Sequence, residues 1–118
     1  MDLTAIQEKL ATFAAERNWD QFHSPKNLSM ALAAEAAELL EIFQWMTEEQ
    51  SRALPESAEE TEMASQEIAD VFIYLVRLAD KLNIDIEKSV LDKISVNEKR
   101  YPVDISRNSS QKYSRRKK

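Results

Sequence analysis

Residues 24–46 read SPKNLSMALAAEAAELLEIFQWM, and this stretch decides the fold class. Ser24 is a typical helix N-cap, and Pro25 suits the first helical position because an N–H there would have no partner. The apolar residues that follow form one stripe, within about 60° of one another on a helical wheel. They are Leu28, Leu32, Leu39 and Phe43. The stretch therefore predicts a long amphipathic helix.

The rest of the chain gives the same kind of signal, and we expect an all-α fold, a bundle of about four to five helices. Thr47 and Ser57 each begin a capping-box pattern, and Asp85 is a candidate N-cap. Residues 18–23 are too few for a helix and are expected to form a loop. The expected helices cover residues 2–17, 25–46, 47–54, 57–82 and 86–101.

The long helix over 57–82 carries an apolar face that we expect to line the core. Its members are Ile68, Val71, Phe72, Leu75, Leu78, Ala79 and Leu82.

Composition excludes several classes of protein. The chain has no Gly, which argues against hairpin-rich folds and excludes Gly-rich phosphate loops. It has no Cys, which excludes disulfides, thiolate catalysis and Cys-based zinc sites. The sequence shows neither a signal pattern nor an apolar run near 20 residues, so we expect a cytoplasmic protein without a membrane segment.

The charge is distributed unevenly along the 118 residues. Residues 1–102 hold 10 Lys and Arg against 20 Asp and Glu, and we expect them to form one domain. Residues 103–118 hold 6 Lys and Arg against one Asp, and lack periodic apolar residues. We expect a basic, flexible tail that is solvated and does not contact nucleic acid.

Two acidic pairs are the clearest functional signal. Glu35 and Glu38 lie three residues apart on one expected helix, and Glu67 and Asp70 do so on another, so each pair shares a helix face. If the pairs face each other, the like charges repel by about 1–4 kcal/mol per pair, which a divalent cation would relieve. Oxygen ligands favour Mg²⁺, Mn²⁺ or Ca²⁺. A di-iron bundle needs Glu-x-x-His pairs, and the single His23 lies outside both pairs.

The residues alone leave two interpretations open. An acidic pair on a helix often marks only a face exposed to solvent. Because both pairs border apolar stripes, a metal site is as well supported as a solvated face. Tyr74 and Lys81 share the helix face of Glu67 and Asp70. Lys81 lies about 21 Å along the axis from Glu67, which is far for one triphosphate.

Longer stretches carry a family resemblance. Residues 17–23 (RNWDQFH), 25–28 (PKNL), 41–45 (EIFQW), 70–76 (DVFIYLV) and 97–102 (NEKRYP) resemble the all-α nucleoside triphosphate pyrophosphohydrolases of the MazG-like superfamily, closest to the dCTP pyrophosphatase group. The superfamily signature is Glu-Glu-x-x-Glu, a spacer, then Glu-x-x-Asp. The two acidic pairs fill its last four positions, and Ala34 replaces the leading Glu, which leaves one further ligand or base unassigned.

The resemblance implies roles for individual residues. Mg²⁺, or Mn²⁺, would be held by Glu35, Glu38, Glu67 and Asp70, with Glu38 and Asp70 also catalytic. The nucleotide pocket would be formed by the aromatic rings of Trp19, Trp45 and Tyr74 and by the imidazole of His23. The end of the last helix would contact the nucleotide through Asn97, Lys99, Arg100 and Tyr101. Lys26 and Asn27 are secondary candidates at the mouth of the pocket.

The implied activity is hydrolysis of nucleoside triphosphates, preferably dCTP, to the monophosphate and pyrophosphate. The resemblance also implies a homotetramer built as a dimer of dimers, with sites between subunits. The alternative is a non-catalytic helical module that binds nucleotides or a protein partner, which need not keep all four carboxylates beside Trp45 and Tyr74.

Overall fold

A computed structural model describes residues 1–116, and all regular structure in this range is helical, as expected. The chain divides into two compact units, Met1–Ile84 and the residues from Asp85 onward. The first unit contains α1 (Leu3–Glu16), η1 (Asp20–Phe22), α2 (Pro25–Phe43), α3 (Glu48–Ala53), η2 (Leu54–Glu56) and α4 (Ala58–Lys81). The second contains α5 (Ile86–Arg100), α6 (Val103–Ser106) and η3 (Tyr113–Arg115).

Local capping fixes where the helices begin. The Ser24 hydroxyl accepts a hydrogen bond from the Asn27 backbone N–H at 3.1 Å, with Pro25 in the first turn of α2. Thr47 and Gln50 form the expected reciprocal capping box at 3.0 and 3.1 Å. These bonds satisfy N–H groups that have no partner within the helix, which explains why the sequence located the helix starts well.

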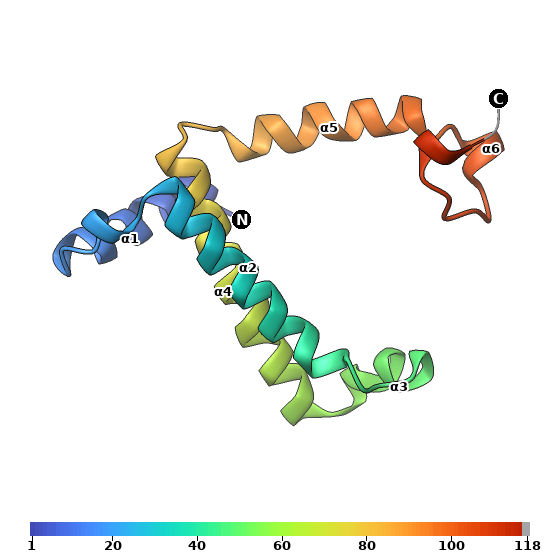
Figure 1. The fold of residues 1–118 in the computed structure, drawn as a ribbon, viewed down its shortest axis with the longest axis horizontal. Coiled ribbons are helices and arrows are strands. Elements are labelled where there is room, and N and C mark those ends of the chain that lie inside the picture. Colours follow the sequence, from blue (N-terminus) through green and yellow to red (C-terminus); the bar gives the residue numbers. More distant parts are fainter. Residues whose placement is uncertain (117–118) are drawn as a thin grey trace. The chain divides into compact units, whose positions relative to one another are not determined.

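The first unit is organised around α2 and α4, which lie side by side (Figure 1). α1 also packs against α4. Leu28 of α2 and Val76 of α4 are the largest fully buried side chains. The remaining buried apolar residues are small or few: Ala14, Leu54, Ala64 and Ala79. The pairing of α2 with α4 is therefore the interaction that positions the acidic pairs.

The expected core face of α4 is only partly correct. Ile68, Leu75 and Leu82 were expected in the core, but they are 57%, 39% and 47% exposed. These three residues recur every seven positions and form one stripe along α4, which we call the α4 apolar stripe. Packing by α1 and α2 covers other sides of the helix, where Val76 and Ala79 are buried, and leaves this stripe open to a further partner.

Asparagine takes the place of glycine at the helix ends. Asn18 and Asn83 have φ of 52° and 55°, in the left-handed region. After α1, the Trp19 and Asn18 N–H groups donate to Ala14 and Ala15 carbonyls at 2.9 and 3.1 Å. The same two bonds follow α4, so both helices end in Schellman motifs. The segment expected as a loop after α1 also contains the 3₁₀ turn η1.

The basic segment after residue 102 carries local structure in its described part. It contains α6 and η3, and the rings of Tyr101 and Tyr113 pack edge to face with centroids 5.9 Å apart. The Arg100 guanidinium lies 4.3 Å from the Tyr113 ring centroid. The domain boundary at residue 102 and the flexible tail remain predictions, and residues 117–118 of that tail lie outside the described residues.

No helix in the described part of the chain is both long and apolar enough to cross a bilayer.

Replacing Asn83 tests the left-handed helix end. Asn83→Ala should lower the free energy of unfolding by about 1 kcal/mol, because a Cβ without a compensating polar group strains the left-handed conformation. Asn83→Gly should lose much less, since glycine adopts positive φ without strain. Urea denaturation followed by circular dichroism measures both. Equal losses for the two variants would contradict this account of the turn.

Candidate functional site

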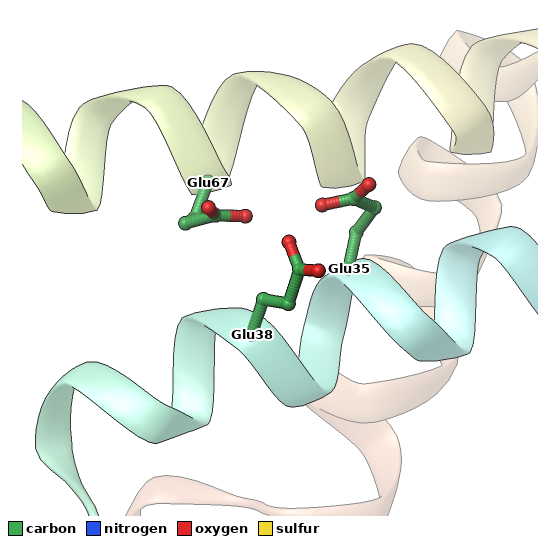
Figure 2. Close-up of side chains that lie close together, drawn as sticks. All are labelled: Glu35, Glu38 and Glu67. Carbon is green, nitrogen blue, oxygen red and sulfur yellow. The ribbon is translucent and has the colours of Figure 1, made fainter.

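Packing of α2 on α4 brings three glutamates together. Glu35 and Glu38 project from α2 towards Glu67 of α4 (Figure 2). One carboxylate oxygen from each lies within 4.8 Å of the others. We call these three residues the carboxylate trio. The i, i+3 spacing on α2 produces this arrangement because it places both side chains on the face that meets α4.

The trio includes buried oxygens without partners. Oε2 of Glu35 and Oε2 of Glu67 are buried and accept no hydrogen bond. Burying such atoms is costly unless something compensates them. Burial, with the neighbouring Glu38 and Glu67 carboxylates, raises the pKa of Glu35 to about 7. Burial likewise raises the pKa of Glu67, against a contribution from Glu35 that lowers it.

A hard divalent cation fits this geometry and chemistry. Mg²⁺, Mn²⁺ and Ca²⁺ prefer oxygen ligands at about 2.0–2.6 Å, so two ligands on opposite sides of one ion are separated by about 4–5 Å. The oxygens of the trio lie within that separation. Glu35 and Glu67 each also have a buried oxygen, Oε2, without a hydrogen-bond partner. The trio can therefore supply three ligands to one ion.

Asp70, the fourth residue of the two acidic pairs, lies outside this close group. It is half-buried, one turn beyond Glu67 on α4, and its charge helps to raise the pKa of both Glu35 and Glu67. It is therefore close enough to act on the trio. Its place among the metal ligands stays a prediction.

A pocket open to solvent adjoins the trio. It has a volume of about 370 Å³, and Glu38 and Glu67 are part of its wall. The other lining residues are Glu41, Ile42, Met63 and Gln66. Met63 and Gln66 belong to none of the motifs that the sequence marks as functional. Helical spacing would have predicted that Met63 lies near the site, because Met63 is one turn before Glu67 and shares the same helix face.

The aromatic candidates are not gathered in one place within the chain. Trp19 and His23 come just before α2, whereas Trp45 follows it and is 88% exposed. The 19 residues of α2 span about 28 Å. Tyr74 is half-buried on α4, two turns beyond Glu67. A single copy of the first unit therefore does not place Trp45 beside His23.

His23 lies among charged side chains at the carboxyl end of α4. Its Nδ1 is 3.2 Å from the Arg77 guanidinium, and its ring meets Trp19 edge to face with centroids 6.3 Å apart. Lys81 pairs with Asp20 at 2.8 Å. Of the secondary candidates, Asn27 donates its side-chain N–H to the Phe22 carbonyl at 3.0 Å. Lys26 is exposed.

The candidates on α5 belong to the second unit. Asn97 and Lys99 are exposed, whereas Arg100 and Tyr101 are half-buried. Tyr113 covers Arg100, and its backbone N–H donates to the Tyr101 hydroxyl at 3.2 Å. The binding roles of these four residues stay predictions.

Comparison with known proteins gives a consistent result. A model of the MazG-like family matches residues 30–115. The chain is 44% identical over 112 residues to human dCTP pyrophosphatase 1 and 42% identical to the rat protein of that name. These matches cover 95% of this chain and 66% of each relative. The structure is similar to that of a pyrophosphatase from Archaeoglobus fulgidus, with a TM-score of 0.76 and 38% identity over 86% of this chain and 94% of that one.

The raised pKa of Glu35 predicts a pH-dependent stability. The unfolded chain gives up the Glu35 proton near pH 4.5, but the fold retains it until about pH 7. The folded state therefore binds more protons in this window, and the free energy of unfolding falls as the pH rises from about 4.5 to about 7. Glu35→Gln should remove this contribution.

Mg²⁺ should reverse the loss, because a cation stabilises the ionised carboxylates. We expect Mg²⁺ to raise the melting temperature more at pH 8 than at pH 5. Differential scanning calorimetry measures this when Mg²⁺ is added to protein from which metal has first been removed with a chelator. Glu8→Gln, at an exposed site on α1, serves as the control and should respond as the unmodified chain does. A melting temperature indifferent to Mg²⁺ at pH 8 would argue against the site.

Proposed function

This chain belongs to the MazG-like family, and on that premise we propose that it is a metal-dependent nucleoside triphosphate pyrophosphohydrolase. The reaction adds water across the α–β phosphoanhydride and yields a nucleoside monophosphate and pyrophosphate. The observation that carries the proposal is the carboxylate trio, with its two buried, unpartnered oxygens beside an open pocket. The names of its relatives support this chemistry.

The resident cation would be Mg²⁺ or Mn²⁺, held by the trio with Asp70 completing the ligand set. When bound, the cation supplies charge neutralisation for the triphosphate and polarises the phosphorus that is attacked. Glu35 and Glu67 would hold the cation at the interface of α2 and α4, because their carboxylates are the half-buried ones. Burial and helix packing hold these two side chains in place.

Glu38 is our candidate for the general base. It is the exposed member of the trio and part of the pocket wall, so its carboxylate reaches solvent and substrate together. Glu38 accepts one proton from the attacking water, and the resulting hydroxide joins phosphorus as the anhydride bond breaks. Asp70 supports the site from the next turn of α4.

The preferred substrate is dCTP, by analogy with the relatives named for that activity. Aromatic faces favour stacking on a nucleobase. The base and sugar would contact Trp19, His23, Trp45 and Tyr74. The family resemblance assigns further nucleotide contacts to the end of α5, through Asn97, Lys99, Arg100 and Tyr101.

Such a pocket requires more than one copy of the chain. Trp45 and His23 lie at opposite ends of α2, about 28 Å apart by helix length, which exceeds what one nucleotide spans. The α4 apolar stripe leaves three large aliphatic side chains partly exposed. Burying these side chains against another copy would add to a small core. We therefore infer association of copies with sites that draw on two subunits, and the family resemblance makes this assembly a homotetramer, a dimer of dimers.

Product analysis tests the activity. Incubation with dCTP and Mg²⁺ should release pyrophosphate and dCMP, and a panel of NTPs and dNTPs should show dCTP as the best substrate. Glu38→Gln and Asp70→Asn should each lower turnover by about 100-fold or more while circular dichroism stays helical. Glu8→Gln should retain full turnover.

Two results would overturn the proposal. Release of orthophosphate and dCDP would mean a different bond is cleaved. Tight dCTP binding without any pyrophosphate would favour the alternative, a non-catalytic nucleotide-binding module.

Assembly has its own test. Size-exclusion chromatography with light scattering should give the mass of a tetramer. Leu75→Glu places a charge in the α4 apolar stripe and should yield a smaller species, because burying the charge is costly. Thr12→Glu adds the same charge at an exposed position of α1 and should leave the mass unchanged. A monomer in the unmodified protein would refute the assembly.

A further inference from the structure

Arg77 is the one charged residue buried in the described part of the chain, with 4% of its surface exposed. A buried cation is tolerated only when paired and hydrogen-bonded. Arg77 donates to Asp20 Oδ1 at 2.9 Å and to Asp80 Oδ2 at 3.4 Å. Its third partner is not an acid but Nδ1 of His23, at 3.2 Å.

This third contact determines the protonation state of the imidazole. A guanidinium has only N–H donors, so Nδ1 of His23 must accept the bond with its lone pair. A neutral imidazole that accepts at Nδ1 carries its proton on Nε2. The charged groups around the ring agree with a neutral form. Burial lowers the pKa of His23, as do the charges of Arg77 and Lys81, while Asp20 raises it.

The ring is also held in orientation. The His23 backbone N–H donates to the Asp20 carbonyl at 3.1 Å at the end of η1. The Asp20 carboxylate bridges Arg77 and Lys81, and so fastens η1 to the last turns of α4. The Trp19 ring, which precedes η1, also packs edge to face against the imidazole. With Nδ1 committed to Arg77, the edge that remains available is Nε2–H.

We propose that Arg77 is a positioning residue that fixes His23 as the neutral Nε2–H tautomer, so that His23 presents a hydrogen-bond donor to the nucleotide. The ligand atom it selects is an acceptor oxygen, on the base, the sugar or a phosphate. This role rests on the proposed function, which places His23 in the nucleotide pocket. The proposal adds Arg77 to the residues that determine nucleotide binding, although Arg77 does not contact the nucleotide itself.

His23 is the only histidine of the chain, so ¹⁵N-detected NMR of its imidazole is unambiguous. At pH 7 without nucleotide we expect protonated Nε2 and unprotonated Nδ1, with a titration midpoint below 6.5. In Arg77→Gln the midpoint should rise, because the guanidinium charge that lowers the pKa of His23 is removed while Asp20, which raises it, remains. Arg52→Gln removes an exposed arginine of α3 and should leave the spectrum unchanged.

The spectra decide the proposal in either direction. A dominant Nδ1–H tautomer would overturn it, as would a tautomer and midpoint that Arg77→Gln leaves unchanged. If Arg77→Gln fails to fold, Arg77→Lys replaces it. Lysine keeps the charge but lacks the planar fork, so the Nδ1 signal should still shift towards an unbonded nitrogen.

Kinetics test whether Arg77 acts through His23. Arg77→Gln should raise KM for dCTP about 2- to 10-fold, the worth of one hydrogen bond, with a smaller change in kcat. In a His23→Ala background the same substitution should have no further effect on KM, because the positioned group is already gone. Additive effects would overturn the positioning role.

The two proposals fail separately. Lack of any dCTP hydrolysis together with the expected tautomer would refute the proposed function and leave the Arg77–His23 geometry intact. Full turnover with the opposite tautomer would refute the positioning role alone.

Discussion

The contact of α2 with α4 is the constraint on which the rest of the first unit depends. It places Glu35 and Glu38 opposite Glu67, and so buries carboxylate oxygens that no other group of the described chain satisfies. The helix pair thus carries an electrostatic cost at its centre. A cation bound there would remove that cost and would couple folding of the helix pair to occupation of the site.

The middle of this helix pair and the carboxyl end of α4 differ in electrostatic character. The trio near the middle concentrates negative charge, whereas the carboxyl end of α4 sets Arg77 and Lys81 against Asp20. A triphosphate with its cation suits the first environment, and an uncharged base or sugar edge suits the neutral His23 beside the second. Under the proposed function, these two environments would therefore suit different parts of the nucleotide.

Local signals in the sequence predicted much of the fold. Caps such as Ser24 and Thr47 act within one turn, so their effect can be inferred from neighbouring residues. Spacing placed Glu35 and Glu38 on one helix face, but the sequence left open whether that face meets Glu67, because the contact joins two separate helices. The burial of Arg77 could not be predicted, because its partner Asp20 is 57 residues away and arginine is usually exposed. Periodicity likewise placed Leu75 on an apolar helix face, but it does not identify which part of the structure packs against that face.

The asparagines at the helix ends have a consequence for the unfolded chain. A sequence without glycine has fewer backbone conformations available before folding, and so loses less entropy when it folds. Asn18 and Asn83 hold left-handed positions where glycine is usual, and each leaves the unfolded chain less backbone freedom than glycine would. For a first unit with so few buried side chains, a restricted unfolded ensemble compensates in part for what the core lacks.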